Sequence, residues 1–204
     1  MPVRISGVDP ELTKIGQFDA VMNYLDVKAQ EVKVDPAQYD VESLKKFLVH
    51  FHNKYRAYHQ AKPLSTDSTL NSAAQKWANE MAHRRKCLIH EDPSIYGENS
   101  SYFAAVYFPD PKTCAAGIIQ SFYTEGTGYD YSGYNSNSWT QKGHFTQLLW
   151  RSSTKIGVGV TIVKRGRADH IYVCLKYDPP GNVQTAEEYF ENVKAPKQKM
   201  CSIM

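Results

Sequence analysis

The chain has 204 residues, of which 42% are hydrophobic and 22% are charged, so it is not globally disordered and has room for one domain with an appendage. Its formal net charge of +3 is too small to indicate nucleic-acid binding, and we expect no nucleic-acid partner. The longest apolar run, Tyr102–Phe108, is much shorter than the ~20 residues that a membrane-spanning helix needs.

All the helices predicted from the sequence lie in the first two thirds of the chain. Residues 1–39 show no strong periodicity except a short helical pattern at 18–22, and we interpret them as an N-terminal leader of uncertain order. Apolar residues then recur at spacings of three and four, which places them on one face of a helix. The pattern predicts three helices, at 40–62, 67–81 and 111–125.

The later part of the chain changes its hydrophobic period from helical to alternating. Apolar residues alternate with glycine and threonine over 156–162, which predicts a strand. The charged, glycine-containing segment 164–169 predicts a hairpin turn, and 171–176 the returning strand. Helices followed by paired strands indicate an α+β fold in layers, rather than a doubly wound parallel sheet.

Two histidines and two glutamates are candidate site residues: His90, Glu98, Glu125 and His144. The sequence contains no zinc-ligand motif, phosphate-binding loop or serine-nucleophile motif around them. Glu125 lies on the apolar face of the third predicted helix, where a carboxylate must be paired or line a cavity. A single histidine is more often structural than a ligand. Residue spacing alone therefore leaves both structural and functional roles open.

The last four residues, 201–204, read Cys-Ser-Ile-Met and fit the C-a-a-X prenylation pattern, with Met at the position typical of farnesylation. One lipid chain alone attaches a protein only weakly, so a second signal is needed. Lys194, Lys197 and Lys199 precede this box, and each basic residue near an anionic membrane adds about 1 kcal/mol. We predict a farnesyl group on Cys201 and a basic, extended tail that binds anionic lipids.

The basic tail also accounts for the net charge of the chain. Residues 194–204 hold three lysines and no acid, so residues 1–193 sum to zero. No apolar core of signal-peptide length follows the first residues, and four cysteines are fewer than a disulfide framework often carries. We therefore expect a non-secreted, cytoplasmic protein, peripheral on a cytosolic membrane face such as that of the Golgi or the plasma membrane.

Four motifs occur in order along the chain. They lie at 52–56 (His-Asn-Lys-Tyr-Arg), 96–99 (Tyr-Gly-Glu-Asn), 143–153 (Gly-His-Phe-Thr-Gln-Leu-Leu-Trp-Arg-Ser-Ser) and 177–182 (Tyr-Asp-Pro-Pro-Gly-Asn). Together they resemble the signatures of the CAP superfamily, which comprises cysteine-rich secretory proteins, antigen 5 and pathogenesis-related 1 proteins. The resemblance covers about residues 41–193 and is closest to the non-secreted, Golgi-associated branch.

This resemblance implies a three-layer α-β-α sandwich over residues 40–193, with an open cleft. It implies that His90, Glu98, Glu125 and His144 line that cleft. Family members with disulfides place a cysteine one residue after Cys174, so Cys174 is expected to be a free thiol. The resemblance also implies sterol or lipid binding and allows a homodimer.

Two functions are consistent with these residues. The first is a binding protein on a cytosolic membrane surface, which engages lipid, sterol or partner proteins. The alternative is a zinc-dependent hydrolase. Neutral imidazoles of His90 and His144 would hold Zn²⁺ in a weak, open site. Glu98 and Glu125 would either orient the imidazoles or act as general bases.

Overall fold

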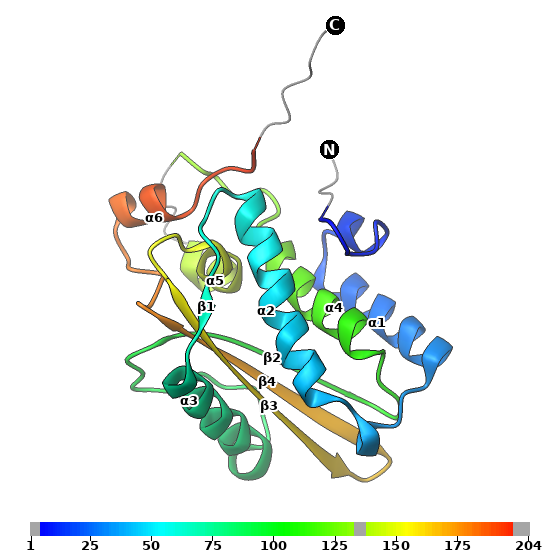
Figure 1. Cartoon of the computed structure of the whole chain (residues 1–204). Helices are drawn as coiled ribbons and strands as arrows, with labels where there is room; N and C mark the ends of the chain where they lie inside the picture. The colour runs from blue at the N-terminus through cyan, green and yellow to red at the C-terminus, as the bar shows by residue number, and fades with distance from the viewer. Residues whose placement is uncertain (1–4, 133–137, 198–204) are drawn as a thin grey trace, which may run out of the picture.

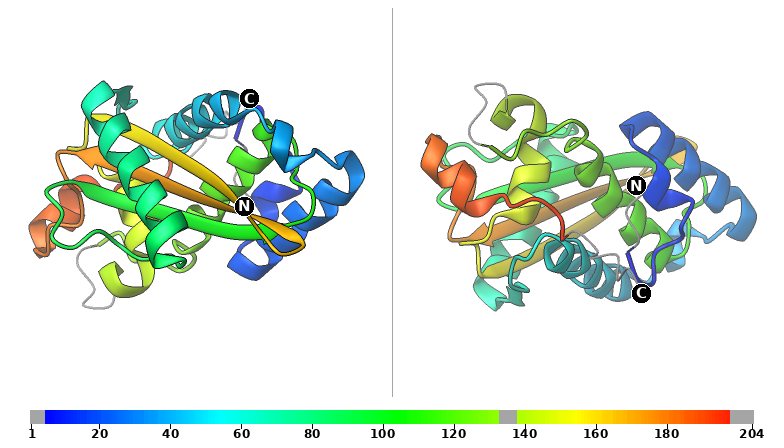
Figure 2. Two further views of the ribbon diagram at one scale, coloured as in Figure 1. Left: turned by 90° about the horizontal axis from the view of Figure 1, so that it is seen from below. Right: turned by 90° about the horizontal axis from the view of Figure 1, so that it is seen from above.

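The structure is a computed structural model that describes residues 5–132 and 138–197. These residues form three layers, of which a four-stranded sheet is the middle one (Figure 1). Helix α3 (Ser68–Asn79) covers one face of the sheet, and helices α2 (Val41–Tyr58) and α4 (Pro111–Thr124) cover the other. In Figure 2, α3 lies in front of the sheet seen from below, and α2 and α4 lie in front seen from above. The predicted α+β sandwich is confirmed.

The three helices predicted from periodicity each begin after an aspartate. The carboxylates of Asp40, Asp67 and Asp110 accept hydrogen bonds from backbone N–H groups two or three residues later. Such caps satisfy donors that the first helical turn leaves unpaired. The start of each helix is thus encoded locally, which is why sequence patterns located all three.

The sheet has the order β1-β3-β4-β2. Its strands are β1 (Ser65–Thr66), β2 (Gly97–Ala105), β3 (Lys155–Arg165) and β4 (Ala168–Asp178). Strands β3 and β4 form the predicted hairpin, and its turn contains Gly166 at φ 63°. Strand β2 was not predicted. It pairs antiparallel with β4 and begins in the motif at 96–99.

The glycines in β3 allow a helix to approach closely. Ile156, Val158 and Val160 are buried in the main core. A Cβ atom at Gly157 would overlap the backbone of Leu70, and one at Gly159 would overlap that of Ala74. The backbone of α3 therefore packs directly on β3. The alternation in the sequence therefore reflects two covered faces of β3. Its apolar side chains pack into the main core, and its glycines lie against the backbone of α3.

Replacement of Gly159 by Ala is expected to lower the free energy of unfolding by about 2 kcal/mol, because the α3 backbone cannot move aside as a side chain could. Urea denaturation followed by circular dichroism measures this loss. Gly16→Ala is the matched control, since its Cβ would lie 3.6 Å from Thr127 Oγ1, an ordinary contact. Equal stability of the two variants would contradict this packing.

Residues 5–39 belong to the folded body, although the sequence suggested a separate leader of uncertain order. Helix α1 (Phe18–Val32) packs against α4, and Ile5, Val8 and Leu12 are buried in the main core. The buried residues of α1 are spaced by four, at 21, 25 and 29, and the residues between them include Asn23, Asp26 and Lys28. Because this apolar stripe is narrow, the sequence pattern revealed only the beginning of the helix.

The remaining helical segments are short or irregular. They are the 3₁₀ helices at Leu12–Lys14 and Pro36–Gln38, the π-helical turn η3 (Glu80–Arg85), α5 (Ser138–Leu149) and α6 (Ala186–Asn192). The sequence analysis did not predict α5 or α6. In the ranges that the structure describes, we find no helix long and apolar enough to cross a membrane.

His59, at the end of α2, joins three parts of the chain. Its Nδ1 donates to the Lys194 carbonyl at 2.7 Å, and its Nε2 accepts from the Tyr123 hydroxyl at 2.9 Å. Burial lowers the pKa of His59 to about 4. In the unfolded chain His59 takes up a proton as the pH falls below about 6.5, whereas in the folded chain it stays neutral until the pH nears 4.

The stability of the protein is therefore expected to fall as the pH decreases from about 6.5 toward 4. His52 adds to this trend, since burial and the nearby Arg56 hold its pKa well below its ordinary value. Urea denaturation at a series of pH values measures the effect. In His59→Gln the dependence on pH should become shallower over this range. An unchanged dependence in that variant would show that His59 does not contribute.

Candidate functional site

The four candidate residues from distant parts of the chain meet at one place. The rings of His90 and His144 lie 5.9 Å apart between their centroids. His90 Nδ1 is 2.7 Å from Glu98 Oε1, and His144 Nδ1 is 2.6 Å from Glu125 Oε1. The structure thus forms two histidine–glutamate pairs whose imidazoles face each other.

Strand β2 positions both histidines through neighbouring residues. Side chains alternate between the two faces of a strand, so Glu98 and Asn99 point in opposite directions. Glu98 Oε1 accepts from His90 and from the Ser100 hydroxyl at 2.9 Å. Asn99 is fully buried, and its Nδ2 donates to the His144 carbonyl at 2.9 Å. The motif at 96–99 therefore connects the two halves of the site.

Glu125 lies at the C-terminal end of α4 and fixes the start of a helical segment in α5. Helix α5 is kinked at Lys142, where φ is −132° and ψ is 18°. The backbone N–H groups of His144 and Phe145 that follow donate to Glu125 Oε2 at 2.9 and 3.3 Å. Phe122, one turn before Glu125, stacks on the His144 ring at 5.0 Å. The imidazole of His144 is thus held by a hydrogen bond and by an aromatic face.

Lys176 is a site residue that the sequence analysis missed. It is paired across the sheet with Glu98, and its fully buried Nζ lies 2.7 Å from Glu98 Oε2 and from Glu91 Oε2. Burial favours the neutral form of Glu98, but hydrogen bonds from His90 and Lys176 outweigh this effect and lower its pKa to about 2. Cys174, on the same strand, is a buried free thiol, as expected.

A signal for Lys176 is present in the sequence. It is a lysine within the otherwise uncharged and largely apolar stretch 171–177, predicted to be a strand. Lysine is almost never fully buried without a partner. The position therefore indicated a buried carboxylate, but its identity depended on the pairing of β4 with the unpredicted strand β2.

The hydrogen bonds define what the pairs can do chemically. Both Nδ1 atoms donate to carboxylates, so each Nε2 of the neutral rings carries a free lone pair. His144 Nε2 is buried, and the described ranges offer it no hydrogen-bond partner. Such a donor pair fits a divalent cation such as Zn²⁺. The described residues contain no group of three or more histidine, cysteine or acidic side chains suited to a metal ion, so other ligands would have to complete its shell.

The carboxylates themselves are fully engaged. The two oxygens of Glu98 accept from His90, Ser100, Lys176 and the Glu91 backbone, the last at 3.3 Å. Those of Glu125 accept from the ring and backbone of His144 and from Phe145. Of the two roles left open by the sequence, this geometry favours orientation of the imidazoles over general-base chemistry.

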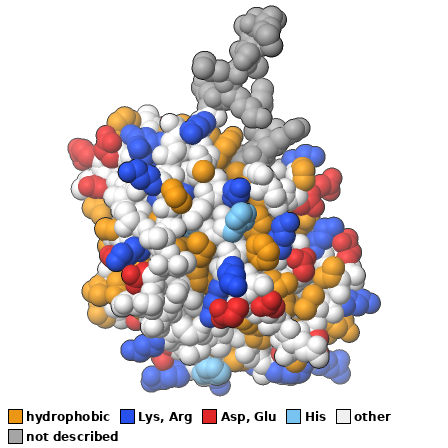
Figure 3. Space-filling view, viewed as in Figure 1, with side chains coloured by type: hydrophobic (Ala, Val, Ile, Leu, Met, Phe, Trp, Pro, Cys, Tyr) orange, Lys and Arg blue, Asp and Glu red, His pale blue; other side chains and the backbone are white. Residues whose placement is uncertain are grey.

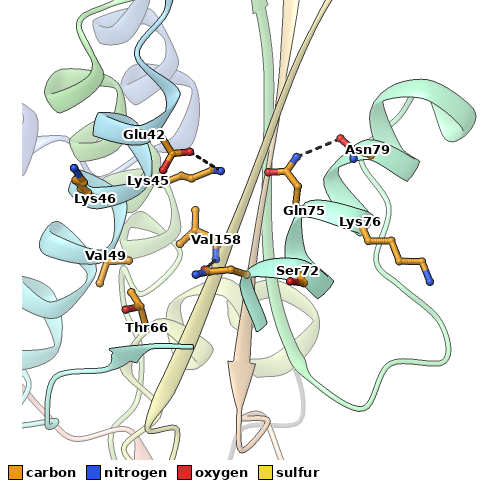
Figure 4. Close-up of a pocket in the computed structure, with 11 residues that line it drawn as sticks. Glu42, Lys45, Lys46, Val49, Thr66, Ser72, Gln75, Lys76, Asn79 and Val158 are labelled. Carbon is orange, nitrogen blue, oxygen red and sulfur yellow. Dashed lines mark hydrogen bonds and ion pairs between the residues drawn. The ribbon is translucent and has the colours of Figure 1, made fainter. Parts of the chain in front are cut away.

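A separate groove of about 820 Å³ lies between α2 and α3 and contains none of these four residues (Figure 4). Strand β1 pairs with only the first residues of β3, and the groove lies along the edge of β3 that β1 leaves uncovered. Asn71 Oδ1 accepts from the Val158 N–H at 2.8 Å, and Gln75 Nε2 donates to the Val160 carbonyl at 2.9 Å. Lys45 pairs with Glu42 at 3.0 Å. The side chains of α3 thus take the place of a further strand along this edge.

The described part of the predicted basic tail lies against the body instead of extending away. The Lys197 N–H donates to the Tyr58 carbonyl at 3.0 Å. Lys194 is half-buried, with Nζ 3.6 Å from Glu191 and 4.2 Å above the Phe190 ring. Hydrogen bonds from Lys197 to Tyr58 and from His59 to Lys194 therefore hold 194–197 against the body, where the sequence predicted an exposed tail. Cys201 and Lys199 lie outside the described residues.

The surface charge agrees with a neutral body. On the face shown in Figure 3, basic and acidic side chains are interspersed. Lys197 is exposed, whereas Lys194 is already paired with Glu191. Of the two described lysines assigned to membrane electrostatics, Lys197 is the one available to an anionic surface.

Comparison with known proteins links this site to a family. The CAP model, described as the cysteine-rich secretory protein family, matches residues 49–177. Secreted protein RBT4 of Candida albicans is 35% identical over 154 residues, which cover 72% of this chain and 39% of that protein. Golgi-associated plant pathogenesis-related protein 1 of Homo sapiens is 32% identical over 148 residues, covering 72% of this chain and 90% of that protein.

Solved structures support the same fold. The crystal structure of NaASP2 with Zn²⁺ matches with a TM-score of 0.55 and 19% sequence identity, covering 79% of this chain and 91% of that one. This likeness concerns the fold alone. The family model spans more than half of the chain and includes all four candidate residues. The chain therefore belongs to the CAP superfamily, and its relatives include both secreted and Golgi-associated proteins.

Proposed function

We propose that this CAP-domain protein acts by binding, at a cytosolic membrane surface, where the domain engages lipid, sterol or a partner protein. The observation that carries this proposal is that every oxygen of the Glu98 and Glu125 carboxylates accepts a hydrogen bond. A carboxylate whose oxygens all accept hydrogen bonds is a poor general base and a good support for a rigid binding site. The Golgi association named for one relative supports a location at a membrane.

Attachment to the membrane is assigned to a farnesyl group on Cys201, with Lys197 and Lys199 as the electrostatic part. Intact-mass measurement of the protein from its native cell tests this assignment. The expected mass includes a farnesyl group and a methyl ester and lacks the last three residues. Cell fractionation of Cys201→Ser is the second test. Unchanged membrane association of this variant would overturn the assignment.

Binding by the domain is tested separately from the anchor. Unprenylated and farnesylated proteins are compared in co-sedimentation with vesicles of phosphatidylcholine, phosphatidylserine and cholesterol. We expect the unprenylated domain to bind measurably and the farnesyl group to strengthen binding. If the unprenylated domain does not bind, lipid is excluded as its ligand, and a partner protein becomes the ligand to seek.

A zinc-dependent hydrolase is the second candidate, favoured by the buried, unpartnered Nε2 of His144. His90 and His144 would hold the ion, which would supply Lewis acidity in the cleft. Calorimetric titration with Zn²⁺ should show weak binding that His144→Ala abolishes. His83→Ala, which removes an exposed histidine outside the cleft, is the control. Zinc binding without turnover on ester and peptide substrates would count against the hydrolase.

A further inference from the structure

The last described residues of the chain form one side of a pocket that contains none of the candidate site residues. Its volume is about 630 Å³, within the range of roughly 300–1,000 Å³ that is typical of small-molecule sites. Its lining comes from the segments that follow α2, α5 and α6, and consists of Gln60, Arg151, Lys194, Ala195, Pro196 and Lys197. We call it the tail pocket. Three of its six lining residues are basic and none is acidic, which favours an anionic ligand.

The wall of the tail pocket that carries Arg151 is anchored through its backbone. The Arg151 N–H donates to the Asn192 carbonyl at 3.2 Å. The buried guanidinium of Arg56 donates to the carbonyls of Trp150 and Ser153, before and after Arg151 in the chain, at 2.7 and 3.0 Å. None of these bonds uses the side chain of Arg151, which is exposed. Its guanidinium is therefore presented to the pocket from a fixed backbone.

The opposite wall, residues 194–197, is also held by hydrogen bonds. His59 Nδ1 donates to the Lys194 carbonyl at 2.7 Å, and the Lys197 N–H donates to the Tyr58 carbonyl at 3.0 Å. In Figure 3, several Lys and Arg side chains lie at the upper left, next to α6 and the last described residues. Two lysine side chains thus start from an ordered segment that faces Arg151 across the pocket.

The positive charge of the tail pocket is only partly compensated. Among residues 5–132 and 138–197, no acidic side chain forms an ion pair with Arg151 or Lys197. Glu191 lies 3.6 Å from Lys194 Nζ, but its side chain is 69% exposed. A solvated pair of this kind contributes little, so an incoming anion can compete with Glu191. With three cations and one carboxylate counted, the pocket keeps a formal charge of +2.

We propose that the tail pocket binds the phosphate group of a phosphomonoester. A guanidinium presents parallel N–H donors that match two phosphate oxygens, and the two ammonium groups add donors and charge around them. A phosphomonoester carries about −1.5 to −2 charges at neutral pH, which matches the charge of the pocket better than a single carboxylate does. The ester is either a soluble molecule or the headgroup of a membrane lipid. This inference goes beyond the proposed function, because it uses neither the histidine–glutamate pairs nor the prenyl group.

Titration of the full, unprenylated chain with glycerol 3-phosphate tests the soluble source. Nuclear magnetic resonance shifts of the backbone amides measure the dissociation constant. Arg151→Gln should weaken binding by about tenfold or more, because it removes a charged donor, whereas its backbone N–H still reaches Asn192. Arg167→Gln, on the exposed turn of the β3–β4 hairpin, is the matched control and should bind as wild type does. Glycerol, which lacks the phosphate, should not bind.

Vesicle binding of the same unprenylated chain tests the lipid source. Vesicles of phosphatidylcholine contain either phosphatidic acid, whose headgroup is a phosphomonoester, or phosphatidylserine, at matched surface charge. A preference for phosphatidic acid that Arg151→Gln lowers and Arg167→Gln retains would identify a lipid headgroup as the ligand. Binding of glycerol 3-phosphate that depends on Arg151, without this preference among vesicles, would identify a soluble ester.

The remaining outcomes overturn one proposal without the other. If wild type neither binds glycerol 3-phosphate nor prefers phosphatidic acid, the tail pocket is not a phosphate site. Equal binding by Arg151→Gln and wild type, or equal weakening in Arg151→Gln and Arg167→Gln, would also overturn the inference, since the pocket would then play no specific part. None of these results affects membrane attachment through the prenyl group. Farnesylated protein that fails to bind membranes would instead overturn the proposed function.

Discussion

Replacement of Lys176 by Met is expected to lower the free energy of unfolding by about 3–5 kcal/mol. The fully buried ammonium lies 2.7 Å from Glu91 and from Glu98. Without it, two carboxylates share a site with no cation between them, and Glu98 loses a hydrogen bond that keeps it ionised. Urea denaturation of the purified variant measures the loss.

Two further variants make the Lys176 test specific. Lys28→Met removes an ion pair of 2.8 Å to the exposed Glu31 on the surface of α1 and should cost less than about 1 kcal/mol. Glu91→Gln added to Lys176→Met should restore part of the stability. The pKa of His90 lies above its usual value because of the hydrogen bond to Glu98, and the charge of Lys176 opposes this rise. If Lys176→Met lowers the free energy of unfolding by no more than about 0.5 kcal/mol, the effect of an ordinary surface substitution, the assigned network is contradicted.

Replacement of Arg56 by Met is expected to cost about 3–5 kcal/mol, because buried carbonyl groups lose their donors. The guanidinium is fully buried and donates to the carbonyls of Lys62, Leu148, Trp150 and Ser153 at 2.7–3.3 Å. Burial lowers its pKa to about 10, so it remains charged at neutral pH. Thermal and urea denaturation measure the loss.

The conservative variant Arg56→Lys should be intermediate in stability, since an ammonium has three donors where the guanidinium has five. Arg167→Met, on the exposed turn of the β3–β4 hairpin, should leave stability unchanged. Equal stability of Arg56→Met and wild type would show that water replaces the guanidinium. The expected loss would establish that the motif at 52–56 supports the motif at 143–153 structurally.

The elements found from the sequence are those with strong local signals. Helices α2, α3 and α4 combine a regular apolar face with an aspartate cap, and the β3–β4 hairpin combines alternation with a glycine turn. Strand β2 lacks such a signal, because Gly97–Ala105 begins with polar and small residues. Pairing with β4 makes it a strand, and that pairing joins residues 64 to 80 positions apart along the chain, from Ala105 with Asp169 to Gly97 with Tyr177.

The candidate site shows the same division. Resemblance to the CAP motifs identified His90, Glu98, Glu125 and His144, and the structure brings all four together. It did not identify the groups that hold them. Ser100 reaches Glu98 because both lie on the same face of β2, and Lys176 reaches it through the register of β2 with β4. The kink in α5 turns backbone N–H groups toward Glu125. The choice between orienting and proton-transferring carboxylates depended on these partners.

The sequence by itself determined the α+β class, the positions of three helices and one hairpin, and the four residues that meet in the candidate site, because periodicity, caps and motifs are local properties of the chain. It also located the net positive charge in residues 194–204. Only the tertiary structure decided that residues 5–39 pack into the folded body, that Lys194 is paired, and that Lys176 holds Glu98. These outcomes depend on burial and on contacts between distant segments, which exist only after the layers have packed.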